Sequence, residues 1–341
     1  YLSMDNTTKS CDGTCRCKCL CWLKAVICLA IVIGVAVAAY AIGRNIHRKA
    51  QIPVLLAAAE TDLDAGKLYS AMSNLSSACS LGALPEQTDG LKNKITEALS
   101  SKALSFAIAG QTIQMRYCPE GTFLMGSDKK EKVRKDDEVL HEVTITKPYW
   151  LSACEIDQAL WNAVLESNNS HFKSDENPVE EINWDQAKDF CEKLNADASI
   201  VRPEGYHFSL PTEAQWEMAC RAGSAAAYSG AILDDICWYA GNGEYKSHPV
   251  GSKAPNLLGL HDMHGNVWEW CLDAYEEYPS TAVTDPLVQG EPNARRIYRG
   301  GSWGYEAEFC RSASRAKNHT RNINHDLGFR LALIPDDISL K

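Results

Sequence analysis

The sequence lacks a basic block that would offset its formal net charge of −10. This absence argues against a nucleic-acid partner, because contacts to a phosphate backbone need clustered Lys and Arg side chains. Compositional bias is absent too. The 341 residues are 45% hydrophobic and 23% charged, as in a globular protein and unlike a disordered or fibrous one. A chain of this length has room for one large or two modest domains.

Long apolar runs are also absent, with one exception. Residues 25–43 carry no charge and lie between Lys24 and Arg44. At about 1.5 Å per residue, a helix of this length reaches about 28 Å, close to the ~30 Å hydrocarbon core of a bilayer. We therefore predict a transmembrane helix over residues 25–43. A signal peptide cleaved near residues 39–41 is the alternative, and the balanced flanking charges do not set an orientation.

The fourteen cysteines form two groups. Five lie within residues 11–21 and Cys28 lies inside the apolar run, whereas the other eight are spread singly from Cys79 to Cys310. The first group defines a Cys-rich N-terminal tail, residues 1–24, for which S-acylation, a metal cluster and unmodified thiols all remain open. The second suits tertiary disulfides in an oxidising compartment. We therefore predict a single-pass membrane protein whose C-terminal domain is extracytoplasmic.

Residues 50–108 have the apolar periodicity of helices. Leu56, Ala59 and Leu63 follow at intervals of three or four, and Gly66 interrupts the pattern. The segment resembles one or one and a half tetratricopeptide-like helix pairs. A single pair cannot bury its apolar face alone, so we predict a short helical stalk that packs on the next domain or self-associates with another copy.

From residue 112 onward the pattern changes to short strands and many turns. Alternating apolar residues predict a hairpin formed by residues 121–126 and 142–145. Asn183 precedes a helix with one apolar face. Residues 212–215 read as a capping box that opens a second helix, which Gly223 ends.

Several sequence blocks follow one another in an order found in one protein family. They are residues 123–126, 177–179, 210–217, 259–270, 299–303, 310–315 and 327–330. In this order they resemble the formylglycine-generating enzyme family, also called the sulfatase-modifying factor family, over residues 112–335. The resemblance implies an α+β, C-type-lectin-like fold, preceded here by the transmembrane helix and the stalk.

The resemblance also bears on catalysis. In the family's oxidases a copper(I) ion is bound by two cysteines, the first of them three residues after the serine of the Gly-Gly-Ser block, here Ser302. This chain has Tyr305 at that position, and only Cys310 precedes the arginine-rich strand. The missing thiolate argues against copper and against formylglycine generation. Cys310 corresponds instead to a family cysteine in a disulfide, which implies a bond between Cys220 and Cys310.

The resemblance further implies one structural calcium ion. The family holds it with backbone carbonyls and one carboxylate, which correspond here to Gly265, Asn266, Val267 and Glu269. Oxygen ligands on a curved backbone suit this hard cation. The alternative is a structural turn in which Glu269 forms a salt bridge.

A non-enzymatic branch with this fold comprises the variable proteins of diversity-generating retroelements. Their variable residues lie between the Gly-Gly-Ser-Trp and Gly-Phe-Arg blocks, which corresponds here to residues 304–326. In this chain the segment mixes Tyr, Asn, Ser, Gly and charged residues, a composition that suits an adaptable binding surface and also any solvated loop. We predict that a protein or glycan ligand contacts Tyr305, Phe309, His319 and Asn322.

The sequence therefore predicts a membrane-anchored, non-catalytic, lectin-like display module. Two alternatives stay open: an oxidase-type sulfatase maturation factor, and a structural subunit of an envelope complex that docks through the stalk. An iron-dependent sulfoxide synthase is disfavoured, because His261 and His264 lack a third histidine at the usual spacing.

Overall fold

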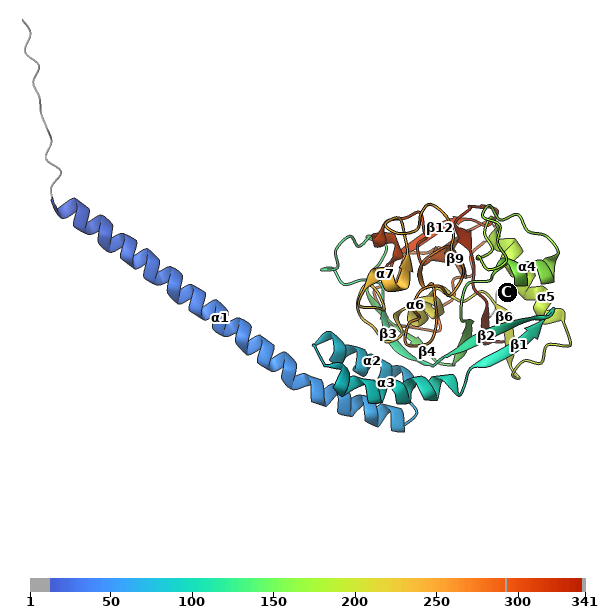
Figure 1. Cartoon of the computed structure of the whole chain (residues 1–341), viewed down its shortest axis with the longest axis horizontal. Helices are drawn as coiled ribbons and strands as arrows, with labels where there is room; N and C mark the ends of the chain where they lie inside the picture. The colour runs from blue at the N-terminus through green and yellow to red at the C-terminus, as the bar shows by residue number, and fades with distance from the viewer. Residues whose placement is uncertain (1–12, 292, 339–341) are drawn as a thin grey trace, which may run out of the picture.

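The computed structural model describes residues 13–291 and 293–338, with side chains for residue 30 and from residue 33 onward. Three helices come first, α1 (Gly13–Asp64), α2 (Leu68–Ser80) and α3 (Pro85–Ser100). Most of α1 projects away from the C-terminal domain, while its last turns, α2 and α3 pack together at the base of that domain (Figure 1).

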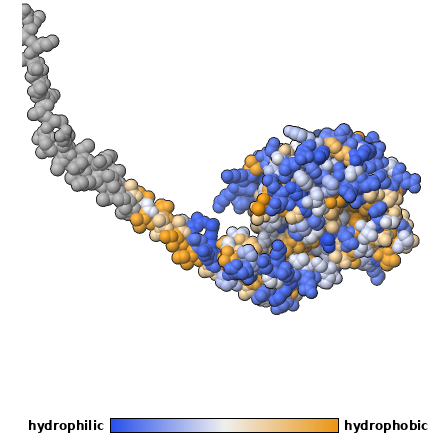
Figure 2. Space-filling model, in the orientation of Figure 1, coloured by the Kyte–Doolittle hydropathy of each residue, from blue (hydrophilic) through white to orange (hydrophobic). Residues whose placement is uncertain are grey.

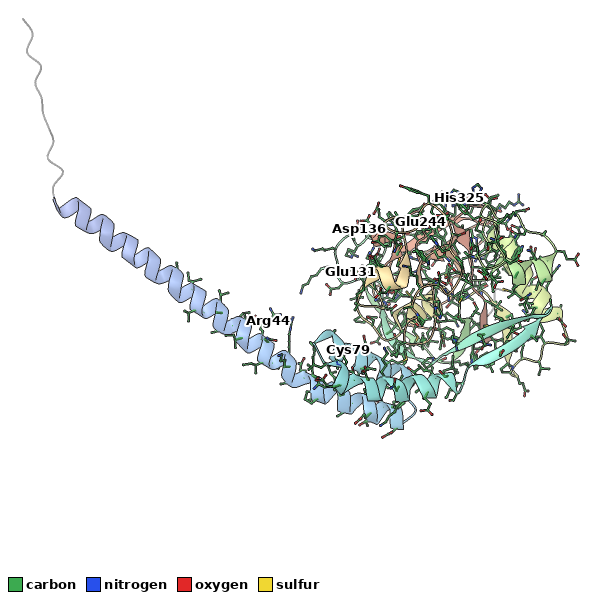
Figure 3. All side chains as sticks on the ribbon, viewed as in Figure 1. Arg44, Cys79, Glu131, Asp136, Glu244 and His325 are labelled. Carbon is green, nitrogen blue, oxygen red and sulfur yellow. The ribbon has the colours of Figure 1, made fainter. Side chains whose placement is uncertain are left out.

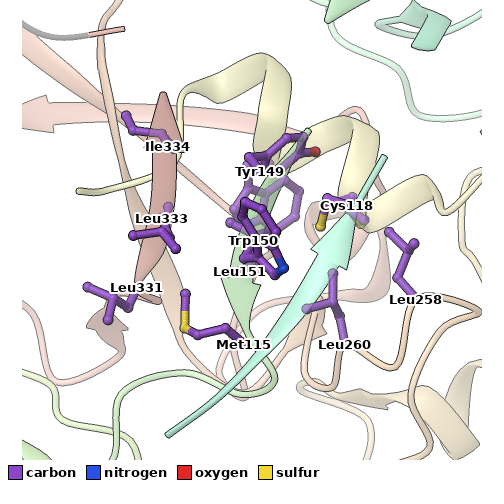
Figure 4. Close-up of a cluster of buried hydrophobic side chains, with 14 of the residues drawn as sticks. Met115, Cys118, Tyr149, Trp150, Leu151, Leu258, Leu260, Leu331, Leu333 and Ile334 are labelled. Atoms are coloured by element: carbon purple, nitrogen blue, oxygen red, sulfur yellow. The ribbon is translucent and has the colours of Figure 1, made fainter. Parts of the chain in front are cut away.

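The largest sheet brings the two ends of the C-terminal domain together. All its neighbouring strands are antiparallel, in the order β1 (Leu104–Ile108), β2 (Gln111–Cys118), β5 (Tyr149–Ser152), β14 (Ala332–Pro335) and β6 (Tyr206–Ser209). Met115, Leu151 and Leu333 from three of these strands are fully buried in the main core (Figure 4). The sheet therefore closes the domain by pairing its last strand with its early ones.

Three smaller sheets and several short helices complete the domain. A four-stranded sheet has the order β12 (Arg315–His319), β11 (Arg295–Arg299), β9 (Trp268–Ala274), β13 (Leu327–Gly328). A three-stranded sheet contains β10 (Val283–Thr284), β4 (His141–Ile145) and β3 (Gly121–Met125), and a two-stranded sheet contains β7 (Cys237–Trp238) and β8 (His264–Gly265). The helices are α4 (Gln158–Leu165), α5 (Trp184–Ala196), α6 (Glu213–Arg221), α7 (Leu233–Ile236) and the 3₁₀ helix η1 (Ala307–Cys310). The predicted mixed α+β fold is confirmed.

The predicted hairpin and both predicted helices are present. β3 and β4 pair antiparallel. The Asn183 side chain caps α5. At the start of α6 the Thr212 hydroxyl oxygen accepts from the Gln215 backbone amide, and the Gln215 side-chain oxygen accepts from the Thr212 backbone amide. Local capping chemistry fixes both helix starts.

In the N-terminal region the structure differs from the prediction for one segment and leaves the predicted membrane span untested. Among the residues with described side chains, no helix is long and apolar enough to cross a membrane. Of the predicted span, residues 25–29 and 31–32 lie outside that part. The stalk prediction was wrong for residues 104–108, which form β1. Its backbone pairs with β2, and Phe106 and Ile108 lie on its buried face, as the alternation of side chains along a strand requires.

The stalk packs on its own domain, the first of the two predicted alternatives. The Tyr69 ring of α2 meets the Phe123 ring of β3 edge to face, with 6.5 Å between centroids. Gly223, just after α6, lies against the Met72 backbone so closely that an added Cβ atom would stand 2.8 Å from it. Helix α6 ends at Ala222, which is left-handed with a φ of 45°, and Gly223 follows with a φ of +84° and leaves room for α2.

We predict that Gly223→Ala loosens the stalk. The matched control is Gly205→Ala, since Gly205 has a φ of +79° but nothing within 4 Å of an added Cβ. The control should cost about 1–2 kcal/mol of unfolding free energy from backbone strain alone. Gly223→Ala should cost at least twice as much and expose α2 to limited proteolysis. Equal losses in denaturant unfolding of the two variants would contradict the contact.

Candidate functional site

Buried arginines hold the C-terminal loops in place. The Arg299 guanidinium, at the end of β11, is fully buried and binds the carboxylates of Glu213 and Glu217 on α6 and the Ser312 carbonyl. Arg315 binds both oxygens of Glu213, at 2.9 and 2.7 Å. Two separate sequence blocks are thus the two halves of one ion-pair network.

Arg311 fixes the segment that follows η1. Its guanidinium forms a bidentate pair with Glu138, at 2.8 and 2.7 Å, and also binds Glu131 at 2.7 Å. Burial opposes ionisation of Glu138, but the Arg311 charge outweighs it and holds the pKa of that carboxyl below its usual value. The loop from residue 300 to residue 315 is therefore anchored by charge at both ends.

Tyr305 and Phe309 form one half of the predicted ligand surface. Tyr305 is 40% exposed, and its ring meets Trp268 and Phe309 edge to face, with centroids 5.4 and 5.2 Å apart. Phe309 lies in η1, partly buried, with the Lys135 ammonium 4.4 Å from its ring centroid. Partial burial raises the pKa of the Tyr305 hydroxyl. The structure therefore places this predicted pair side by side on a partly exposed surface that packs against Trp268.

His319 and Asn322 form the other half. His319 is exposed at the end of β12, and its carbonyl accepts the Asn322 amide in a turn. The Asn322 side chain donates to Asn324 at 3.3 Å. The structure thus places His319 and Asn322 next to each other. No hydrogen bond or ring contact in the described part of the chain joins them to the Tyr305–Phe309 pair.

An aromatic and histidine cluster that the sequence did not predict lies near the same loops. Trp303 meets Phe172 edge to face at 5.5 Å and His325 at the same distance. His171 packs against Phe172 and His325. His171 and Phe172 come from the loop after α4, so sequence distance hid their part in this surface. His325 lies on the side of the domain away from α2, as its position relative to Cys79 shows (Figure 3).

Ser302 and Asp326 form the buried floor of this region. The Ser302 hydroxyl is inaccessible and donates to Asp326 at 2.8 Å. Burial raises the pKa of Asp326, and the Ser302 hydrogen bond opposes that shift. The Trp303 and Trp268 indole N–H groups are buried and have no hydrogen-bond partner in the described part of the chain. A ligand acceptor reaching the floor would relieve this cost.

The residues at the positions of the family's copper or iron ligands have other partners. Tyr305 stands where the resemblance calls for a thiolate, and Cys310 is fully buried. His261 Nδ1 binds the Lys253 carbonyl, and His264 Nδ1 binds the Cys310 carbonyl. The arrangement does not fit either metal.

Glu269, the carboxylate of the predicted calcium site, is paired with an arginine. The Glu269 carboxylate is fully buried and takes a bidentate pair from Arg330, at 2.6 Å to each oxygen, plus the Trp216 indole at 2.6 Å. The Asn266 side chain is used by His248 and Glu155, and the Val267 amide also binds Glu155. The Arg330 charge offsets that of Glu269, which favours the alternative of a structural turn with Glu269 in a salt bridge, and the calcium site stays a prediction.

The predicted disulfide between Cys220 and Cys310 is not present, since both residues are free, buried thiols. Cys220 Sγ instead lies 3.5 Å from the Ser312 hydroxyl and 3.7 Å from the His264 ring. The eight cysteines from Cys79 onward are all free thiols, so they give no support to an oxidising compartment.

These features define a domain of the lectin-like, sulfatase-modifying-factor type. The family described as the sulfatase-modifying factor enzyme 1-like domain matches residues 103–334, and the chain belongs to this family. The family assignment made from the sequence is therefore confirmed.

Two relatives illustrate the range of the family. Chaperone protein LppX of Paenibacillus barcinonensis is 27% identical over 231 residues, covering 54% of this chain and 79% of that protein. The formylglycine-generating enzyme of Streptomyces coelicolor is 29% identical over 206 residues, covering 54% of this chain but only 60% of the enzyme.

Solved structures confirm the fold. Variable protein 1 of Treponema denticola is 27% identical with a TM-score of 0.60, covering 69% of this chain and 99% of that one. PvdO of Pseudomonas aeruginosa, 24% identical with a TM-score of 0.57, shares the fold over 64% of this chain and 94% of that one. This chain thus resembles a variable protein in structure as well as in sequence.

We predict that Glu269 stabilises the fold through Arg330 and independently of calcium. Glu269→Gln should lower the unfolding free energy by about 3–5 kcal/mol, because it leaves a buried guanidinium poorly compensated. Glu244→Gln, which removes an exposed partner of Lys246, should leave stability unchanged. Chelator should not shift the thermal midpoint of the native chain. A calcium-dependent midpoint that Glu269→Gln abolishes would restore the calcium site.

Proposed function

We propose that this protein is a non-catalytic display module that binds a protein or glycan ligand through residues 302–326. The observation that carries the proposal is Tyr305, a half-exposed aromatic side chain at the position that catalysis in this family would give to a thiolate. It rests on Trp268 while the surrounding arginine network is intact. The frame of an enzyme site is kept without its reactive group.

The composition of the surface supports binding. Tyr305 and Phe309 offer large rigid areas at low entropic cost, and His319 and Asn322 offer adaptable hydrogen bonds. Treponema denticola variable protein 1 matches this chain over the whole of its own length, which favours the same use of the fold.

The oxidase alternative is weaker on chemical grounds. Copper(I) needs soft thiolate ligands. Residues 302–326 contain one cysteine, Cys310 at the end of η1, and both it and its neighbour Cys237 are buried. The Ser302 hydroxyl is bound to Asp326 and inaccessible, so it does not line an open pocket. Neither residue is available to a substrate cysteine.

We also propose that α1 anchors the protein in a membrane, with the domain on the extracytoplasmic side where it would meet ligands. Several large apolar side chains on the projecting part of α1 are exposed, namely Ile33, Val35, Val37, Tyr40, Ile42 and Ile46. They form a hydrophobic surface remote from the domain (Figure 2). A surface of this kind is costly in water and is stabilised by lipid.

We predict that alanine at Tyr305, His319 and Asn322 together abolishes ligand binding without unfolding the chain. Binders would be selected on the full chain from a glycan array and a random-peptide display library. Their affinity should fall at least about 100-fold, because hot-spot truncations cost about 2 kcal/mol or more each. Alanine at Lys92, Lys94 and Glu97, exposed on α3, is the control and should change nothing. Binders that ignore the first variant, or formylglycine formed in a sulfatase peptide, would refute the proposal.

The anchor has its own test. Asp substitutions at Val35 and Val37 should release the chain from cell membranes into the alkaline-carbonate supernatant, because charge in hydrocarbon is strongly disfavoured. Asp at Val201 and Ile232, equally apolar and exposed on the domain, should leave it in the pellet. Release of the unmodified chain by carbonate would count against the anchor.

A further inference from the structure

Two buried thiols lie in contact at the edge of the proposed ligand surface. Cys237 and Cys310, with Ile236, form a small apolar cluster separate from the main core, and Tyr228, Leu233 and Tyr239 pack around it. The Cys237 and Cys310 side chains lie side by side within this cluster. Both cysteines are almost inaccessible.

The backbone around both cysteines is fixed by one strand. His264 of β8 is the Cα partner of Cys237, and its Nδ1 binds the Cys310 carbonyl at 2.7 Å. The Tyr228 hydroxyl donates to the Ala307 carbonyl at 2.7 Å, and the Ala240 amide donates to the Tyr305 carbonyl at 2.9 Å. The loop that carries Cys310 is therefore held beside β7 without any covalent link.

Two glycines make room for the sulfur atoms. A Cβ at Gly301 would stand 2.4 Å from Cys310 Sγ, and a Cβ at Gly265 would stand 2.9 Å from Cys237 Sγ. Cys310 Sγ thus lies in space left by Gly301, and Cys237 Sγ lies in space left by Gly265. A larger residue at either glycine would displace the sulfur atom next to it. Cys220 is directed elsewhere, toward Ser312.

We propose that Cys237 and Cys310 are a disulfide-forming pair, which ties the 302–310 loop to β7. With glutathione disulfide as oxidant, one thiolate attacks it and releases glutathione, and the other then attacks the mixed disulfide and releases a second glutathione. One protein S–S bond forms, two thiol protons are lost, and one glutathione disulfide is reduced to two glutathione molecules. This proposal is independent of the ligand.

The timing of oxidation follows from burial. Desolvation and the Cys310 contact raise the pKa of the Cys237 thiol far above its usual value, so the thiolate is scarce in the folded protein. Oxidation should therefore be fast during folding, while the thiols are still solvated, and slow afterward. The bond reports the redox state of the compartment in which the chain folds.

The test is disulfide mapping of the full chain, refolded in detergent micelles with a glutathione redox buffer and alkylated before digestion. The expected result is a peptide linking residues 237 and 310, which disappears in Cys237→Ser and in Cys310→Ser and persists in Cys271→Ser. Alkylated free thiols at both positions, or a link from Cys310 to Cys220, would overturn the proposal.

Stability gives a second readout. The bond would close a loop between residues 73 apart in the sequence. Reduction should lower the thermal midpoint of the oxidised native chain by about 10 °C and leave that of Cys237→Ser unchanged. The same drop in Cys237→Ser would assign the effect to another bond and refute this one. Ligand binding is measured separately, so the display proposal can fail while the pair stands.

Discussion

The fold depends on the guanidinium of Arg299, which lies between two carboxylates of α6. Arg299, Glu213 and Glu217 are all buried, and Arg315 and Arg221 complete the network on either side. Bringing these charges out of water costs several kcal/mol each, and the cost is offset only when every member is present with good geometry. Loss of one partner leaves the others buried and uncompensated. This coupling explains why the α6 block and the Gly-Gly-Ser-Trp block occur together in one sequence, since neither is stable without the other.

One consequence is a separation between stability and recognition. Arg299, Arg311 and Arg315 hold the backbone of the loop region from below, through carboxylates on other elements. Tyr305 and His319 are exposed, Asn322 is partly exposed, and none of the three takes part in these ion pairs. Substitutions at the outward positions therefore leave the ion pairs intact. A scaffold of this kind suits a binding protein whose surface diversifies.

Local signals in the sequence predicted local structure well. The caps at Asn183 and Thr212 fixed two helix starts, because a side chain and an amide three residues apart decide them. Pairings between distant residues could not be deduced in the same way. The resemblance implies calcium at Glu269, with a salt bridge as the alternative, but the sequence cannot name the partner, Arg330, which lies 61 residues away. Cys310 was paired with Cys220 by analogy, whereas Cys237 is its neighbour in space. The prediction of a helical stalk extends over residues 104–108, which form β1 in the structure. The sequence does not show that this short segment pairs with β2.

The contact between stalk and domain links the two ends of the molecule. Tyr69 is buried against Phe123, and Met72 closes over Gly223 at the end of α6, the same helix that carries Glu213 and Glu217. The path from α2 to the Arg299 network thus runs through one helix of nine residues. Close packing of α2 against β3 and the end of α6 resists sliding of the stalk over the domain. The direction of α1 is therefore linked to that of the loops that α6 supports. On the proposed anchor, this rigid path would hold the surface of Tyr305 and His325 away from the bilayer, where a ligand can reach it.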